Sequence, residues 1–176
     1  SLDFSNTALR EFSCENNPVL EYVNMKNGMI SGGFTPVLSF TFTPLLKFIC
    51  VDENEDTTVL NTLGENLSQV IVSSYCTFVP GGNFNTITGN VLYDFNNNGC
   101  DTADFANPYT KVNINNGTNS GSSFTNATGT YTFYTQAGNF TLTPEMENTN
   151  YFNFSPSNAV INFPIADNST QTQNFC

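Results

Sequence analysis

The sequence contains no histidine, and this absence excludes several kinds of active site. A Ser-His-Asp triad, a Cys-His dyad and a zinc or iron centre with histidine ligands all need an imidazole ring. A pair of carboxylates could still act as acid and base. Because lysine and arginine are also few and scattered, we expect no activated nucleophile and therefore no enzyme.

Positive charge is scarce as well. The chain has 4 lysines and arginines against 15 aspartates and glutamates, which gives a formal net charge of −11. Nucleic-acid binding depends on basic side chains that replace counterions at the phosphates, so we expect no nucleic-acid partner. An anionic membrane surface is disfavoured for the same reason. No segment approaches the roughly 20 apolar residues that span a bilayer, so we expect no membrane span.

Long windows rich in alanine, leucine, glutamate and lysine, which favour helices, are also missing. Asparagine, threonine, serine and glycine dominate instead, together with 17 phenylalanines and 7 tyrosines. These residues favour strands and turns. The composition therefore predicts a mainly β protein.

The first third of the chain repeats the pattern L-x-x-Φ-x-Φ-x-N, in which Φ is apolar. This pattern is the core of the leucine-rich repeat, and it predicts a solenoid whose apolar positions point inward. The asparagine can bond backbone groups where the strand leaves the sheet. The successive units contain Leu2, Phe4 and Asn6; Leu9, Phe12, Cys14 and Asn16; Leu20, Val23, Met25 and Asn27; and Leu46, Ile49, Val51 and Glu53.

An acidic run, Asp52-Glu53-Asn54-Glu55-Asp56, interrupts this rhythm. We interpret it as a solvated turn in preference to a metal site. An open solenoid end exposes its core and needs a cap. The segment from Glu53 to Val79, with a short helix at 59–63 and a strand at 70–72, is the predicted cap. Residues 1–79 thus form the predicted repeats and C-terminal cap, and 80–85, beginning Pro-Gly-Gly-Asn, form a linker.

The second part of the chain, 86–176, alternates short β-patterned segments with turn signals. This arrangement predicts a seven-stranded antiparallel β-sandwich. The predicted strands are 86–93, 111–115, 122–125, 130–135, 139–143, 159–163 and 170–175.

The 5 cysteines form no C-x-x-C pair, so a zinc ribbon or thioredoxin motif is unsupported. An odd number fits two disulfides and one buried thiol. Cys50 and Cys76 bracket the predicted cap, Cys100 and Cys176 bracket most of the sandwich, and Cys14 occupies an apolar repeat position. The alternative is five reduced, buried thiols. Disulfides and this composition suit an oxidising, extracellular setting.

Two resemblances cover nearly the whole chain. Residues 1–79 resemble the C-terminal repeats and cap of leucine-rich-repeat proteins of the Bacteroidetes surface. Residues 85–176 resemble the B-type domain of Gram-positive surface adhesins, in the version common in flavobacteria. The stretches that carry them are Asn6-Thr7-Ala8-Leu9, residues 17–28, Phe48-Ile49-Cys50-Val51-Asp52, Ile87-Thr88-Gly89-Asn90-Val91, residues 93–99, Gly129-Thr130-Tyr131-Thr132-Phe133 and residues 137–142.

The resemblance implies a piece of a large exported protein. Relatives with this pairing typically carry a C-terminal sorting domain for the type IX secretion system. The resemblance therefore implies the secretion machinery as a partner, recognised through a sorting domain that is not among these residues. The resemblance implies surface attachment, adhesion or a spacer role without catalysis, and it names no ligand.

One loop has metal-binding chemistry. Asp94, Asn96 and Asn98, followed by Gly99, match the start of an EF-hand-like calcium loop, D-x-N-x-N-G. The Cys100 carbonyl and the carboxylates of Asp101 and Asp104 could complete a Ca²⁺ site. The two later acids fall at positions 8 and 11 of the loop, whereas B-type domains place them at 9 and 12. The alternative is an asparagine-rich turn stabilised by its own side-chain bonds, with a disulfide at Cys100 holding it closed.

A possible ligand-binding face comprises Tyr22, Asn24 and Phe48. Both aromatic residues directly precede an inward position of a repeat, so both should face outward, where they could anchor a surface glycan or a protein ligand. The alternative is that each ring only covers its neighbour. The leading hypothesis is a binding or adhesion module, and the alternatives are a structural stalk or an accessory region of a large exported enzyme.

Overall fold

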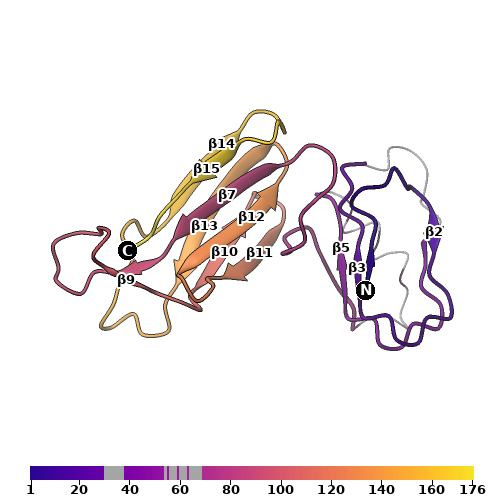
Figure 1. Ribbon diagram of the computed structural model, residues 1–176, viewed down its shortest axis with the longest axis horizontal. Coiled ribbons are helices and arrows are strands. Elements are labelled where there is room, and N and C mark those ends of the chain that lie inside the picture. The colour runs from indigo at the N-terminus through magenta and orange to yellow at the C-terminus, as the bar shows by residue number, and fades with distance from the viewer. Residues whose placement is uncertain (30–37, 54, 56–58, 60–62, 64–68) are drawn as a thin grey trace. The chain divides into compact units, whose positions relative to one another are not determined.

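The computed structural model describes residues 1–29, 38–53, 55, 59, 63 and 69–176. The chain forms two compact units, Ser1–Phe84 and Asn85–Cys176. Both are built mainly from β-strands, as the composition predicts (Figure 1). Within the described residues, no helix has the length and apolar character needed to cross a bilayer.

In its described residues, the first unit contains two parallel sheets. The larger has the strand order β1 (Leu2–Asp3), β3 (Tyr22–Asn24), β5 (Phe48–Cys50) and β6 (Ile71–Ser73). The smaller pairs β2 (Phe12–Ser13) with β4 (Leu38–Ser39). From β1 to β5 the chain alternates between the two sheets, and β6 then joins the larger sheet beside β5. The first three copies of the repeat pattern therefore lie in alternate sheets, whereas the third and fourth, at β3 and β5, share the larger sheet.

The predicted inward positions form the core of this unit. Val23 and Ile49 are neighbours in register on β3 and β5, and both are fully buried. Leu2 and Leu9 are exceptions, at 36% and 44% exposure. The Leu9 backbone carbonyl accepts a bond from the side-chain amide of Asn27 (2.9 Å), in the segment that follows β3. The core cluster comprises Cys14, Leu20, Val23, Phe40, Leu46, Ile49, Val51, Val59, Leu63 and Val70.

Part of the predicted cap falls outside the described residues, namely 54, 56–58, 60–62 and 64–68. The short helix predicted at 59–63 lies largely there, although Val59 and Leu63 have helical backbone and pack into the core. The predicted strand at 70–72 corresponds to β6, which extends the larger sheet in parallel with β5. A disulfide between Cys50 and Cys76 joins β5 to the segment that follows β6.

The first part of the predicted linker is packed. Pro80 and Gly81 are buried in the first unit, where the Gly81 N–H donates to the Lys26 carbonyl (2.8 Å). Asn85 is buried in the second unit and bonds the Ile165 carbonyl. Residues 82–84 are therefore what connects the two units.

The second unit has seven strands in two sheets, with an additional short hairpin (Figure 1). The four-stranded antiparallel sheet has the order β11 (Ser120–Phe124), β10 (Lys111–Asn115), β13 (Gly138–Glu145) and β14 (Ala159–Phe163). The three-stranded sheet has the order β12 (Thr130–Thr135), β7 (Asn85–Asn90) and β15 (Thr170–Thr172). The hairpin pairs β8 (Leu92–Tyr93) with β9 (Phe105–Ala106).

One pair corrects the prediction of a wholly antiparallel fold, because β15 runs parallel to β7. The Asn85 side chain accepts bonds from the Asp167 N–H (3.1 Å) and the Ser169 hydroxyl (3.2 Å). These bonds fix the crossover segment beside the start of β7, so β15 begins at the same end as β7. Gly89 permits the close approach of the segment after β15, since a Cβ there would lie 1.6 Å from the Gln173 carbonyl oxygen.

Alternate residues are buried along β7, β10, β12, β13 and β14, as expected for strands with one face on a core. Along β12 these are Tyr131, Phe133 and Thr135, and along β10 they are Val112 and Ile114. The alternation of apolar and polar residues in the sequence, with a period of two, is the pattern that predicts these strands.

Candidate functional site

An apolar row lies on the outer face of the larger sheet of the first unit. Tyr22 on β3, Phe48 on β5 and Ile71 on β6 are direct neighbours in register. Residues in register on adjacent strands project from the same side of a sheet. Tyr22 is 40% exposed, Ile71 is 61% exposed and Phe48 is half-buried, whereas the next register position is occupied by the buried Val23 and Ile49. We call Tyr22, Phe48 and Ile71 the outer apolar row.

The prediction that Asn24 belongs to this face is wrong. Its side chain is fully buried, donates to the Asp3 carboxylate (3.0 Å) and accepts a bond from the Lys26 N–H (3.1 Å). These bonds tie the end of β3 to β1, so the amide is not available to a ligand.

Ile71, in contrast, was missed by the sequence analysis. The sequence pattern predicts a strand of the cap at residues 70–72, and the predicted repeats end before it. The signal was present, because aligning Val72 with Ile49 places Ile71 beside Phe48.

An ion pair between Glu21 and Lys47 flanks the outer apolar row at the start of β3 and β5. The hydrogen bond and charge of Lys47 lower the pKa of Glu21, and Glu21 raises the pKa of Lys47 in the same way. Both groups are exposed to water, which screens their attraction. The outer apolar row is therefore bordered at this end by one negative and one positive side chain.

The acidic run forms part of a buried charged cluster. Asp52, Glu53 and Glu55 are all buried, so the prediction of a solvated turn is wrong for these three residues. Asn54 and Asp56 lie outside the described residues. Burial is tolerated because Lys26, itself fully buried, supplies a positive charge and because backbone N–H groups bond Asp52.

The contacts of this cluster are specific. The Lys26 ammonium donates to the Ser74 carbonyl (2.7 Å), and Asp52 Oδ2 accepts from the N–H groups of Asn27 (3.1 Å) and Gly28 (2.9 Å). Desolvation lowers the pKa of Lys26, while Glu53 and Asp52 act in the opposite direction. Desolvation also raises the pKa of Asp52. Since no substrate can reach a fully buried amine, we interpret Lys26 as a structural cation.

The loop between β8 and β9 contains the predicted calcium ligands and is folded by its own side chains. The two carboxylate oxygens of Asp94 accept from the N–H groups of Asn98 (3.2 Å) and Gly99 (2.9 Å), and Asn96 Oδ1 also accepts from Asn98 N–H (3.1 Å). Asn97 and Gly99 have positive φ angles of 58° and 96°. Glycine serves at the second of these positions because L side chains rarely adopt such a backbone conformation.

The two later acids close the other side of this loop. Asp101 accepts from the Ala103 N–H (2.7 Å) and the Asn98 side-chain amide (3.4 Å), and Asp104 Oδ2 accepts from the Asp101 N–H (2.8 Å). Asp104 Oδ1 is buried and has no hydrogen-bond partner. Asp94, Asn96, Asn98, Asp101 and Asp104 thus share one short loop, but the carboxylates of Asp94, Asp101 and Asp104 do not form a group with oxygens within 4.8 Å of one another.

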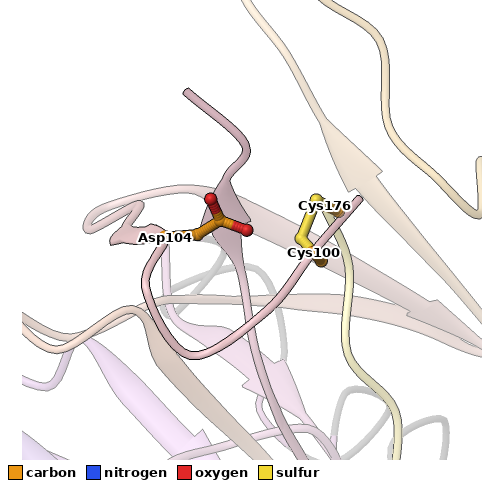
Figure 2. A group of neighbouring side chains, drawn as sticks. All are labelled: Cys100, Asp104 and Cys176. Carbon is orange, nitrogen blue, oxygen red and sulfur yellow. A yellow bond between two sulfur atoms is a disulfide. The ribbon is translucent and has the colours of Figure 1, made fainter. Parts of the chain in front are cut away.

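A disulfide holds this loop to the C-terminal segment. Figure 2 shows the carboxylate of Asp104 near the bond between Cys100 and Cys176. Their ligand atoms lie within 4.8 Å of one another, the one such group among the described residues. Because both sulfurs are consumed in the disulfide, neither can act as a thiolate ligand or nucleophile. Any metal in this region would have to use oxygen atoms.

The pairing of the cysteines agrees with the prediction. The structure contains Cys50–Cys76 and Cys100–Cys176, and Cys14 is a free, buried thiol. Burial raises the pKa of the Cys14 thiol, which disfavours the reactive thiolate. The two disulfides indicate an oxidising environment such as the extracellular space.

No family model and no curated protein matches the chain. The features of the chain that bear on its function are the outer apolar row, the buried charged cluster and the loop at 94–104.

Proposed function

We propose that the chain is a non-catalytic, ligand-binding part of a large protein that is secreted to the cell surface. In this proposal the first unit is the end of a leucine-rich-repeat solenoid with its cap, and the second is a B-type β-sandwich that supports or spaces it. The observation that carries the proposal is the outer apolar row. An apolar row on the outer face of a repeat sheet suits the recognition of a partner.

The contacts of the first unit support the solenoid interpretation. Parallel strands recur along the chain, their apolar residues share one core, and one of the three repeat asparagines, Asn27, bonds the backbone as the repeat pattern predicts. Asn27 donates to the Leu9 carbonyl (2.9 Å) and accepts from the Met29 N–H (3.0 Å), so it bonds backbone groups after the strand. The proposed array ends at β6, where the Cys50–Cys76 disulfide joins the capping segment to β5.

Secretion is supported by the two disulfides, which persist where the environment is oxidising. We propose export by the type IX secretion system through a sorting domain outside these residues. The proposed partner is a surface glycan or a protein ligand.

An array experiment separates binding from a purely structural role. The fragment, purified with its disulfides intact, would be applied to glycan and host-protein arrays. We expect at least one ligand with saturable binding. A structural stalk would give none, and glycan or peptide turnover that is lost on replacing one carboxylate would show that the chain is an enzyme.

We further propose that the loop at 94–104 binds Ca²⁺. Calcium prefers six to eight oxygen ligands, and this loop supplies carboxylate and amide oxygens on alternate residues. The buried, unpartnered Asp104 Oδ1 supports the proposal, since a buried oxygen without a partner is costly. The ligand set would draw on Asp94, Asn96, Asn98, the Cys100 carbonyl, Asp101 and Asp104. A bound ion would offset the repulsion among the three carboxylates.

Calcium should then raise the melting temperature of the second unit. Binding to the folded state alone stabilises it by about 2.7 kcal/mol at a hundredfold excess over Kd. Extracellular sites commonly bind at about 0.1–1 mM. About 10 mM calcium is then a ten- to hundredfold excess, worth about 1.4–2.7 kcal/mol, and should be compared with chelator by differential scanning calorimetry. Asp94→Ala should abolish the calcium-dependent shift.

Asp167→Ala is the matched control, because Asp167 lies outside the loop and caps a turn by accepting from the Ser169 N–H (3.1 Å). Its melting temperature in chelator should fall, while the shift caused by calcium should persist. If calcium and chelator give the unmutated protein one melting temperature, the loop is only a turn.

A further inference from the structure

Four exposed aromatic side chains lie on or beside the β8–β9 hairpin of the second unit. Tyr93 and Phe105 are direct partners in the antiparallel pair, so their side chains share a face. Phe95 contacts Phe105 with ring centroids 4.9 Å apart, and Phe152 packs edge-on against Tyr93 at 6.0 Å. We call Tyr93, Phe95, Phe105 and Phe152 the aromatic hairpin patch.

This patch remains open to solvent despite its internal contacts. Each ring is at least 45% exposed, and Phe105 reaches 60%. Contiguous exposed apolar surface marks an interaction site more often than a scattered residue does. The mutual contacts also fix the rings in place, so little order has to be gained when a partner binds.

The charge around the patch determines which partner it suits. Asp94, Asp101 and Asp104 all belong to the loop of the same hairpin. The one cation of residues 85–176 is Lys111, on β10, and it pairs with Glu145 at 2.9 Å. The hairpin therefore joins aromatic rings to an acidic loop and has no basic residue of its own.

We propose that the aromatic hairpin patch docks an arginine-bearing segment of a partner protein. The face of an aromatic ring is electron-rich and attracts cations, and the planar guanidinium also stacks on such rings. Carboxylates in the same hairpin add a favourable field for a positive partner and repel an acidic one. This surface is in a different unit from the outer apolar row, so the inference does not depend on the ligand proposed there.

The experiment uses a synthetic peptide of alternating glycine and arginine and the same peptide with citrulline at each arginine. Citrulline keeps nearly the same shape but carries no charge. Binding to the intact fragment would be measured by fluorescence anisotropy in chelator, so that the loop carboxylates keep their charge. We expect the arginine peptide to bind and the citrulline peptide to bind at least tenfold more weakly.

Two variants test whether the rings themselves are needed. Phe105→Leu keeps an apolar side chain and the net charge but removes a ring from the patch; it should weaken arginine-peptide binding about two- to fivefold. Phe124→Leu is the matched control, because Phe124 is 61% exposed on β11, outside the patch. Its affinity should equal that of the unmutated protein, and calorimetry would confirm that both variants are folded.

Three results would overturn the proposal. Equal affinity in both variants and the unmutated protein would mean that net charge alone attracts the peptide. Equal binding of the citrulline peptide would mean that the patch recognises no cation. A dimer in light scattering that dissociates on Phe105→Leu would mean that a second copy of this chain covers the patch.

Discussion

Replacing both Cys100 and Cys176 with serine should lower the free energy of unfolding of the second unit by about 4.5 kcal/mol. The disulfide joins residues 76 positions apart, and closing a long loop restricts the unfolded chain strongly. The measurement is urea unfolding followed by the fluorescence of the tyrosines. Because the chain has two compact units, two transitions should be fitted separately.

The other disulfide supplies the control. The Cys50→Ser, Cys76→Ser double variant opens a loop of sequence separation 26, so it should destabilise the first unit by about 3.5 kcal/mol. It should leave the transition of the second unit unchanged. If either double variant lost both unfolding transitions, the claim that each disulfide stabilises only its own unit would be contradicted.

Lys26→Ala should destabilise the first unit by about 3–5 kcal/mol. Removing one partner of a buried ionic cluster leaves the remaining charges without compensation. Here Asp52 and Glu53 would stay buried without the ammonium, and the Ser74 carbonyl would lose its donor. Lys47→Ala is the matched control, since Lys47 pairs with Glu21 in water and its loss should have little effect.

The loss of unfolding free energy caused by Lys26→Ala should become smaller as the pH falls from 7 toward 4. Burial already raises the pKa of Asp52 above its usual 3.8, and loss of the nearby positive charge raises that pKa further. The folded variant then binds more protons than its unfolded chain in this window, so its stability rises as the pH falls. If Lys26→Ala lowered the free energy of unfolding no more than Lys47→Ala does, or by an amount that does not change with pH, the stabilising role of Lys26 in the buried charged cluster would be contradicted.

The strands of the second unit could be predicted well because their alternation is regular. The bounds predicted for 111–115, 130–135 and 159–163 coincide with those of β10, β12 and β14. The direction of β15 could not be predicted in this way. It depends on the Asn85 side chain bonding residues 165–169, a contact between distant parts of the chain that leaves no local pattern.

In the first unit the sequence predicts inward positions better than it predicts which sheet a strand joins. The same motif surrounds Phe12 and Val23, yet these residues lie in β2 and β3 of different sheets. The burial of Asp52 was missed for a related reason. Its counter-charge, Lys26, comes from an earlier turn of the chain, so the local acidic run resembles a solvated one.

The loop at 94–104, for which we propose calcium binding, lies between these cases. The spacing of Asp94, Asn96 and Asn98 predicts that their oxygens converge, and the structure places them in one hydrogen-bonded turn. The buried Asp104 Oδ1 has no signature in sequence. Residue spacing alone does not determine the loop geometry. It therefore does not predict which oxygens accept bonds from backbone N–H groups and which remain without a partner and could bind an ion.

The most direct test of the central claim is the affinity of an array ligand for variants of the outer apolar row. Tyr22→Ala combined with Ile71→Ala should weaken binding in isothermal titration calorimetry about thirtyfold, as expected when the two anchors together contribute about 2 kcal/mol. Val19→Ala is the control, because Val19 is 79% exposed in a turn outside the sheet; it should bind like the unmutated protein. Full affinity in the double variant would show that the outer apolar row is not the ligand-binding face.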